Sequence, residues 1–431
     1  MPFRYCEKLF TELYFFGTPL SGERTISPCC SEVSIDYPVF LCNEIFFDIH
    51  AYKKFIESVL FELQTETTLC RECPDLVYCD NDPTKYRHKF SITHFQFSTN
   101  IGYCNCRCTY CAQDLSMRGS TGYPAMPLLN NLLKENILAK DCRMSWGGGE
   151  PTFAPDFSEV CAELRKNGTY QEFFTNSTLF SQEIALTLRE NKGLVLTSLD
   201  AGTRETYRKV KGIDAFSAVV RNLRAYANEN PDALILKYLV TDENADRDEM
   251  DAFFDLCEEI TEKPRIACSC DGYGYKYDVK RVGSKVIDAM DYFTMQMETR
   301  DFILSSYRWI PLTVEEELKQ RSLARLWPEI KQKAISLEGK EAVFWGGGQA
   351  YEQYKHLFAE VRAHAFLQTI TPDVGLREYD GIPLMHPDEY FTGNSKFSFV
   401  VFCRRENREM FEKNIKSYLH RCNEDIVWCL I

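Results

Sequence analysis

NIGYCNCRCTYC, residues 100–111, is the stretch that decides the fold, and it follows an apolar, strand-like run from Phe90 to Ser98. Three of its cysteines, Cys104, Cys108 and Cys111, form a CxxxCxxC array. A loop this tight does not suit a disulfide frame, whereas thiolates are soft ligands that select iron clusters and zinc. Three ligands leave one iron of an iron–sulfur cube open to a substrate or cosubstrate, while structural zinc sites close with four protein ligands. The spacing therefore indicates a catalytic metal cluster rather than a structural metal site.

A second stretch, WGGGEPT at residues 146–152, strengthens this interpretation. Glycine permits close approach of the backbone to a ligand, and Glu150 can neutralise an ammonium group. An array with an aromatic residue, Tyr110, before its last cysteine and a GGEP segment downstream resembles the radical S-adenosylmethionine (SAM) enzymes. The resemblance implies a [4Fe-4S] cluster on Cys104, Cys108 and Cys111, with SAM on its open iron. It also implies that four residues of the GGEP segment bind SAM: Gly148, Gly149, Glu150 and Pro151.

The alternative for the cysteine array is a zinc knuckle or a chance cluster, and the GGEP segment argues against both. Cys106 does not fit the triad. We expect it to be a spare thiol that points away from the cluster.

The composition bounds the class of protein. With 431 residues the chain has room for about three domains, and 45% hydrophobic residues supply an ample core. A formal net charge of -13 works against a long phosphate-binding surface, so no nucleic acid partner is expected. No apolar run approaches the roughly 20 residues that span a bilayer, so no membrane association is expected. The 19 cysteines come without a secretory signal, which predicts a reduced, cytoplasmic protein.

Residues 1–87 are predicted to form a small cysteine-rich module covered by a helix within residues 44–64. The order of a lone cysteine, Pro-Cys-Cys and CxxC resembles the SPASM or twitch extensions that bind an auxiliary [4Fe-4S] cluster in many radical SAM enzymes. The resemblance implies four ligands: Cys6, Cys29, Cys70 and Cys73. Such extensions usually follow the barrel, and Pro83 stands where a full SPASM motif has a further cysteine. One auxiliary cluster is therefore expected rather than two.

Alternatives at this module stay open. Cys30 can replace Cys29, because adjacent side chains point in different directions. A four-thiolate zinc site uses the same ligands at similar spacing. Cys42 and Cys79 have no partner at ligand spacing and are expected to be buried small hydrophobes.

Residues 88–290 alternate apolar, strand-like runs with amphipathic stretches, which predicts six βα units and a parallel sheet. Two of the amphipathic stretches, Phe157–Lys166 and Phe216–Ala227, show helical spacing. Six repeats resemble the partial (β/α)6, TIM-like barrel of radical SAM enzymes, and the predicted fold class is α/β. The expected strands are Ile92–Ser98, Cys142–Trp146, Tyr170–Thr175, Leu194–Ser198, Leu234–Val240 and Arg265–Cys270.

Polar side chains at the carboxyl ends of these strands are site candidates, because such ends converge on one mouth of a parallel barrel. Asn176 follows the third strand, where the family often has Thr-Asn-Gly, and it either hydrogen-bonds SAM or substrate or forms an Asx turn. Ser198 and Asp200 resemble the family's Ser-x-Asp segment near the SAM ribose and alternate onto one face. The competing interpretation for Asp200 and Thr203 is helix capping.

The sixth strand ends in Cys270 and Asp271, our catalytic candidates where substrate should lie. A thiol near a carbon radical can donate a hydrogen atom, which gives epimerisation. A base can instead take a proton from a ketyl-like radical, which gives oxidation with the auxiliary cluster as electron acceptor. Lys237 and Asn244 near the fifth strand give a weaker signal.

Residues 291–336 are predicted to be a helical linker and residues 337–431 a Rossmann-like α/β domain. The glycine-rich turn with Gly346 and Gly348 would let the backbone approach a phosphate. Tyr351 stands in place of the third glycine, and the next strand lacks the acidic residue that grips a ribose, which argues against a dinucleotide. The following segment resembles Rossmann-like modules of polysaccharide and modified-sugar pathways.

The resemblance as a whole implies an enzyme that reductively cleaves SAM and abstracts a hydrogen atom from a substrate C–H bond. The expected substrate is a sugar, aminocyclitol or nucleotide-sugar that is oxidised or epimerised, with electrons from an external flavodoxin- or ferredoxin-type donor. One alternative is a peptide-modifying radical SAM enzyme, although no peptide-clasping domain is evident. The contrasting class is a non-catalytic iron–sulfur or zinc protein.

Overall fold

The computed structural model describes residues 3–17, 24–29, 38, 40–42, 48–65, 70, 73, 76–79, 90–98, 103–111, 124–270, 282–300, 302–305, 310–346, 349–368, 378–391, 398–403, 407–419 and 426–430. Three predicted positions, Cys30, Asp271 and Gly348, lie outside these residues. The described residues fall into two compact units, one up to residue 266 and one from residue 267, and each is described by itself. No described helix is long and apolar enough to cross a membrane.

The first unit is built on a sheet whose strands run in the order β10-β9-β8-β7-β6-β2-β3-β4. From β10 to β2 every neighbouring pair is parallel, and β3 and β4 continue the sheet antiparallel. The first five predicted barrel strands are confirmed, although β7 begins at Leu138 instead of Cys142. The bounds are β2 Glu12–Gly17, β3 Arg24–Ser27, β4 Phe40–Cys42, β6 Ile92–Ser98, β7 Leu138–Trp146, β8 Tyr170–Phe174, β9 Gly193–Ser198 and β10 Leu234–Val240.

Part of the cysteine-rich segment shares this sheet. Strand β2 pairs with β6 along its length, so residues before the predicted boundary at 87 extend the barrel strands. Outside the sheet, β1 (Phe3–Tyr5) pairs with β5 (Val77–Cys79). The predicted helix is α2 (Ile49–Leu63), which begins where the carboxylate of Asp48 accepts hydrogen bonds from two first-turn amides.

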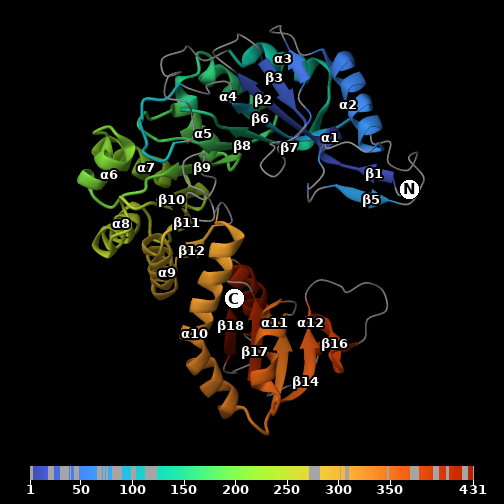
Figure 1. Cartoon of the computed structure of the whole chain (residues 1–431), viewed down its shortest axis with the longest axis vertical. Coiled ribbons are helices and arrows are strands. Elements are labelled where there is room, and N and C mark those ends of the chain that lie inside the picture. The colour runs from blue at the N-terminus through green and yellow to red at the C-terminus, as the bar shows by residue number, and fades with distance from the viewer. Residues whose placement is uncertain are drawn as a thin grey trace. The chain divides into compact units, whose positions relative to one another are not determined.

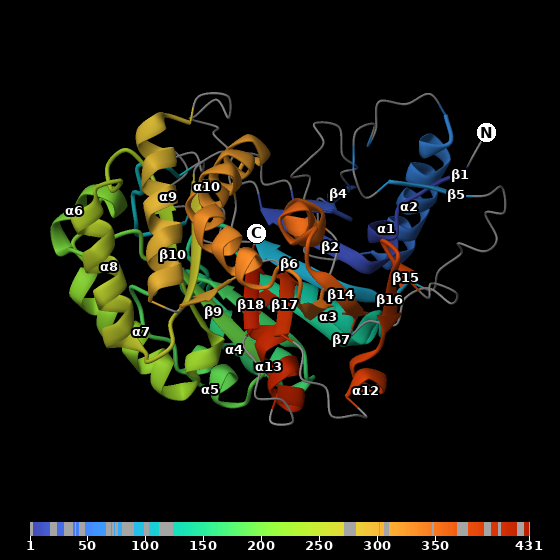
Figure 2. The ribbon, with the colours of Figure 1, turned by 90° about the horizontal axis from the view of Figure 1, so that it is seen from below.

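Helices connect the parallel strands, as the βα pattern predicts. Helices α4, α5, α7 and α8 pack against one another in chain order, which can be followed in Figures 1 and 2. The two helices expected from apolar spacing are confirmed, and α7 runs two residues beyond the predicted end, to Glu229. The bounds are α1 Lys8–Thr11, α3 Met126–Lys134, α4 Phe157–Lys166, α5 Gln182–Arg189, α6 Arg204–Lys211, α7 Phe216–Glu229 and α8 Arg247–Ile260, with short 3-10 turns at Pro151–Phe153 and Pro231–Ala233.

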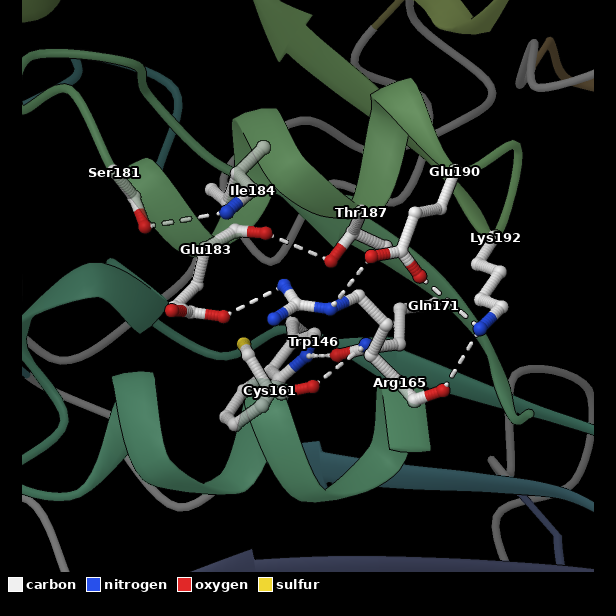
Figure 3. A network of polar contacts seen from close by, with 10 residues as sticks. All are labelled: Trp146, Cys161, Arg165, Gln171, Ser181, Glu183, Ile184, Thr187, Glu190 and Lys192. Atoms are coloured by element: carbon white, nitrogen blue, oxygen red, sulfur yellow. Dashed lines mark hydrogen bonds and ion pairs between the residues drawn. The ribbon is translucent and has the colours of Figure 1, made fainter. Parts of the chain in front are cut away.

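A polar network fastens α4 to the sheet (Figure 3). The indole of Trp146 donates to Gln171 at 3.2 Å, and the amide of Gln171 donates to the carbonyl of Cys161 in α4 at 3.1 Å. Trp146 and Gln171 therefore point to the helix side of the sheet. Since strand side chains alternate, their neighbours Ser145 and Glu172 point to the opposite face.

The same network joins α4 to α5 through one arginine (Figure 3). Arg165 lies 2.7 Å from Glu183 and 3.3 Å from Glu190. Lys192 lies 3.1 Å from the second carboxylate and donates to the Arg165 carbonyl at 3.1 Å. The Arg165–Glu183 pair is largely enclosed, whereas Glu190 and Lys192 are partly exposed, and together these contacts hold α4 and α5 side by side.

The second unit begins with the end of β11 (Arg265–Cys270), which has the predicted bounds. It continues through α9 (Ser284–Thr299) and the short β12 (Ile303–Leu304) to α10 (Leu312–Ser336). Pro311 is the residue before α10, which starts at Leu312. Ion pairs between Arg321 and Asp288 at 2.6 Å and between Arg325 and Asp291 at 2.5 Å join α9 to α10.

The rest of this unit is a six-stranded sheet in the order β15-β16-β14-β13-β17-β18, parallel except for β15. Its parallel strands follow the order third, second, first, fourth, fifth, which is typical of doubly wound sheets. Helices α10 and α11 pack on one face, and α12 and α13 on the other. The bounds are β13 Glu341–Trp345, α11 Gln349–Tyr354, β14 Arg362–Leu367, β15 Glu378–Tyr379, β16 Ile382–Met385, α12 Pro387–Tyr390, β17 Ser398–Cys403, α13 Arg408–Leu419 and β18 Ile426–Leu430, with a 3-10 turn at Lys355–Phe358.

Candidate active site at the carboxyl ends of the barrel strands

Residues 103–111, here named the cluster loop, follow strand β6 and carry the four central cysteines. Cys104, Cys108 and Cys111 are partly exposed, whereas Cys106 is buried. The prediction that Cys106 points away is wrong, because its thiol lies within hydrogen-bond range of the sulfurs of both Cys104 and Cys108 and can donate its single proton to either. Side chains two residues apart share one side of an extended chain, which brings these three thiols together.

The donor set of the cluster loop fits an iron–sulfur cluster chemically. The Cys106 hydrogen bond and the nearby Lys211 ammonium lower the pKa of Cys108 to about 6, in spite of burial, and the pKa of Cys104 is also lowered by Cys106. Thiolates are the form that binds iron. In the described part of the chain, no three Cys, His, Asp or Glu side chains already stand in a metal-binding arrangement.

The cluster loop is fastened to the GGEP segment at its start. The amide of Glu150 donates to the carbonyl of Tyr103 at 2.9 Å, and the rings of Tyr103 and Phe153 meet edge to face at 5.2 Å. Gly148 and Gly149 have φ of 74° and 80°, a conformation that favours glycine. The sequence pattern of the GGEP segment therefore reflects a real backbone requirement.

The carboxylate of Glu150 is the centre of this turn. It is buried and accepts hydrogen bonds from the Thr152 amide and hydroxyl, the Thr175 hydroxyl and the Asn176 amide, at 2.7–3.2 Å. Burial raises the pKa of Glu150 in spite of these four donors. Glu150 thus ties the end of β7 to the end of β8, and its predicted contact with the SAM ammonium stays a prediction.

Asn176 joins the end of β8 to the cluster loop. Its side-chain oxygen accepts from the Thr178 amide at 2.9 Å, which is the Asx turn weighed from the sequence. Its amide nitrogen lies 3.6 Å from the Cys104 sulfur and 2.8 Å from the Asn105 side-chain oxygen. The turn and the contact to a predicted cluster ligand therefore coexist.

Ser198 and Asp200 differ sharply in their surroundings. The Ser198 hydroxyl has no hydrogen-bond partner among the described residues. Asp200 is fully buried, with one carboxylate oxygen accepting from the Leu239 amide at 2.7 Å and the other from Tyr110 and Lys211. The predicted ribose contact of Asp200 stays a prediction, and both of its oxygens are already held by protein donors.

The structure assigns local structural roles to Thr203 and Asn244. Thr203 is a helix cap, because its hydroxyl accepts from the Thr206 amide at the start of α6. Asn244 is buried in a turn, where its amide donates to the carbonyls of Asp200 and Leu239. The catalytic candidate Cys270 is 1% exposed at the end of β11, and its neighbour Asp271 lies outside the described residues.

The four predicted ligands of the auxiliary cluster lie within electrostatic range of one another. Burial, followed by the charges of neighbouring cysteines, raises the pKa of Cys70 to about 12, and burial raises that of Cys6 to about 11. Cys29 and Cys73 contribute to both shifts. These four cysteines therefore lie in one region although Cys6 and Cys73 are 67 residues apart in the chain, and their binding of a cluster stays a prediction.

The turn after β13 is tightly packed in the doubly wound sheet. Gly346 has φ of 82°, and a Cβ there would stand 2.2 Å from the carbonyl oxygen of Phe402. Tyr351, in place of the third glycine, packs its ring against Phe366 and Phe402 and donates to Asp380 at 3.0 Å. Among the described residues, this glycine serves close packing of two strand ends.

Residues 101–278, which include the cluster loop and the GGEP segment, match the family model of the Radical SAM superfamily. The chain contains a radical SAM domain. Radical SAM enzymes use a [4Fe-4S] cluster and SAM, so the family and the donor set of the cluster loop agree.

Curated relatives cover parts of the chain. Fe-coproporphyrin III synthase of Methanosarcina barkeri is 34% identical over 170 residues, which cover 38% of this chain and 40% of that protein. A probable GTP 3',8-cyclase of Saccharolobus islandicus is 26% identical over 161 residues, 36% of this chain and 50% of that protein. The chain thus spans half or less of the length of these curated relatives.

Solved radical SAM structures are also similar. Streptococcus suis SuiB bound to S-adenosylmethionine has a TM-score of 0.41 and 14% identity, covering 61% of this chain and 56% of that chain. Native anSMEcpe with bound AdoMet has a TM-score of 0.39 and 25% identity, covering 48% of this chain and 59% of that chain.

Sequence reasoning missed Lys211 and Gly212. A basic residue followed by glycine at the end of an amphipathic helix is the usual pattern of an exposed helix end. In the structure the Lys211 side chain is only 3% exposed and forms an ion pair with Asp200 beneath the cluster loop. The sequence pattern predicts neither feature.

Proposed function

We propose that Cys104, Cys108 and Cys111 hold a [4Fe-4S] cluster and that the chain is a radical SAM enzyme acting on a substrate C–H bond. The observation that carries this proposal is the cluster loop itself, fastened to the GGEP turn and to the end of β8 within a radical SAM domain. When bound, the cluster supplies the electron that cleaves SAM, and hydrogen-atom abstraction from the substrate follows.

Different residues around the cluster loop are proposed to bind different parts of SAM and to orient the cluster ligands. Gly148 and Gly149 present backbone without side chains, and Glu150 holds their turn against the strand ends. Ser198, whose hydroxyl is free among the described residues, is our candidate for a SAM hydroxyl. Asn176 donates towards the Cys104 sulfur and so orients one proposed ligand.

A row of polar side chains crosses four strands of the sheet. On the face opposite α4, the Tyr14 hydroxyl donates to Glu12 at 2.9 Å and lies 3.2 Å from His94. His94 lies 2.9 Å from the Ser145 hydroxyl, which donates to Glu172 at 2.9 Å. Because Tyr14, Ser145 and Glu172 are buried and this row is bonded within itself, it stabilises the sheet and does not by itself select a substrate. We favour a sugar, aminocyclitol or nucleotide-sugar over a ribosomal peptide because the segment from Tyr379 to Glu389 resembles Rossmann-like modules of modified-sugar pathways.

Production of 5'-deoxyadenosine tests the enzyme assignment. The anaerobically reconstituted chain is incubated with SAM and dithionite, and the nucleoside is quantified by liquid chromatography. We expect 5'-deoxyadenosine from the wild type and none from Cys108→Ala. Cys257→Ala, a buried cysteine of α8, is the matched control and should retain the activity. No nucleoside from a wild type that holds iron would remove the assignment.

An auxiliary [4Fe-4S] cluster on Cys6, Cys29, Cys70 and Cys73 is part of the proposal, with Cys30 as the alternative to Cys29. Iron analysis after reconstitution should give about eight irons per chain for two cubane clusters and about four for one. In Cys70→Ala the count should fall to about four while SAM cleavage continues. A wild type with about four irons and one bound zinc would replace this cluster by a zinc site.

The reaction outcome is tested with Cys270. If its thiol returns a hydrogen atom to the substrate, the product formed in deuterium oxide carries solvent deuterium, and Cys270→Ala abolishes that label. If the auxiliary cluster accepts an electron instead, the product is oxidised by two electrons and carries no label. A panel of nucleotide-sugars, aminocyclitols and short peptides, screened by thermal shift with SAM present, separates the two substrate classes.

A further inference from the structure

Helix α6 is capped by the cluster loop. The amide of Arg107 donates to the Lys211 carbonyl at 2.7 Å, and the amide of Thr109 donates to the Val210 carbonyl at 2.9 Å. The last carbonyls of a helix have no partner within the helix, so these two bonds satisfy them. Both donors lie between proposed cluster ligands, and the end of α6 therefore sets the backbone of the loop that carries those ligands.

Gly212 allows this contact. It has φ of 68°, and a Cβ at this position would stand 2.7 Å from the Cβ and 2.8 Å from the carbonyl oxygen of Arg107. Real Cβ atoms do not approach backbone atoms so closely. The helix end and the loop are thus in direct contact, and position 212 has no room for a side chain.

The side chain of Lys211 turns inward under the same loop. Its ammonium donates to Tyr110 at 2.5 Å and to Asp200, and Tyr110 donates to the same Asp200 oxygen at 2.5 Å. The ammonium also lies 5.0 Å from the centre of the Tyr110 ring. The three groups therefore close a ring of hydrogen bonds.

Asp200 anchors that ring to the sheet. It has φ of 57°, which is uncommon for a residue with a side chain, and its second carboxylate oxygen accepts from the Leu239 amide of β10. A buried ion pair gives little net stability, because removing both charges from water costs as much as their attraction returns. Its place beneath the cluster loop suggests a role in orienting the loop and setting its electrostatic field.

Both charges act on Cys108, and they act with opposite signs. A cluster gains a negative charge on reduction, so a nearby cation favours the reduced form and a nearby anion disfavours it. In the intact pair the two effects oppose each other.

We propose that Lys211 and Asp200, joined through Tyr110, are positioning residues that hold the cluster loop against α6 and balance the charge beneath the cluster. This inference rests on the proposed cluster at Cys104, Cys108 and Cys111. Lys211 acts through the loop and Cys108 and does not contact the substrate. Neutralising one member leaves the other charge unopposed, and the two substitutions therefore shift the reduction potential in opposite directions.

The test is a redox titration that measures the midpoint potential of the cluster. The reduced cluster is monitored by electron paramagnetic resonance and is recognised as the signal that changes when SAM is added. We expect Lys211→Met to lower the potential and Asp200→Asn to raise it. The double variant should return towards the wild-type value. Lys209→Met is the matched control, because Lys209 carries the same charge on the same helix but is exposed, and it should leave the potential unchanged.

Shifts in the same direction, or no shift in either single variant, overturn the charge balance. If Lys211→Met does not take up a cluster, hydrogen exchange in the unloaded protein replaces the potential as the readout. Faster exchange of the Arg107 and Thr109 amides than in Lys209→Met supports the positioning role, and equal exchange overturns it. A wild type with no SAM-responsive cluster refutes the proposed function instead, so the two failures are distinguishable.

Discussion

The packing of Gly212 against the cluster loop makes a quantitative prediction for Gly212→Ala. Two costs add at this position. An L-residue in the left-handed region costs about 1–2 kcal/mol, and forcing a methyl group into a packed contact costs about 1–3 kcal/mol. The clash here is with the Cβ and the carbonyl oxygen of Arg107, at 2.7 and 2.8 Å, and neither atom can rotate away as the far end of a flexible side chain can. We therefore expect a loss of about 2–5 kcal/mol in the free energy of unfolding.

Gly168→Ala is the control that separates the two costs. Gly168 has φ of 77°, and a Cβ there would meet nothing within 4 Å. It should therefore lose only the conformational part, about 1–2 kcal/mol. The difference between the two variants measures the contact between α6 and the cluster loop.

The assay is urea unfolding of the unloaded protein followed by circular dichroism, combined with iron content after reconstitution. Gly212→Ala should bind less iron than Gly168→Ala, because relief of the clash moves the loop that carries the proposed ligands. Equal unfolding free energies and equal iron content in the two variants would refute the reasoning.

Three further predictions follow from the site and the helix layer. Glu150→Gln should weaken SAM binding in equilibrium dialysis. Burial raises the pKa of Glu150, so protonation of this carboxyl stabilises the folded state at low pH. This stabilisation is lost as pH rises through the raised pKa. The urea midpoint of Glu150→Gln should therefore lack the pH dependence that Glu150 gives the wild type. Cys106→Ala removes the donor that lowers the pKa of Cys108, so alkylation of Cys108 at pH 7 in the unloaded protein should slow. Arg165→Ala should cost about 1–3 kcal/mol in urea unfolding, more than Arg189→Ala, whose side chain is 57% exposed.

The amino-acid sequence by itself determined the elements of the barrel and the location of its chemistry. The strand Ile92–Ser98 and the helix Phe157–Lys166 have the bounds that apolar spacing predicts, because that spacing is a local property of the chain. The glycines of the GGEP segment were equally readable, since Gly148 and Gly149 adopt backbone angles that favour glycine over residues with a side chain.

Tertiary structure alone decided the surroundings of each side chain. Sequence spacing excluded Cys106 from the cysteine triad, yet the fold of the loop turns its thiol onto Cys104 and Cys108. The pairing of β2 with β6 joins residues about 80 positions apart, as the contact between Tyr14 and His94 shows, and no local pattern encodes such a pairing.

Lys211 illustrates the physical reason most clearly. Local sequence marks it as a basic residue at a helix end, and the helix forms whether that side chain lies in water or in the interior. Its burial depends on an acceptor at Asp200 and on a loop whose backbone completes α6. Helix and strand propensities act over a few residues, whereas burial and the pairing of charges depend on segments that only the folded chain brings together.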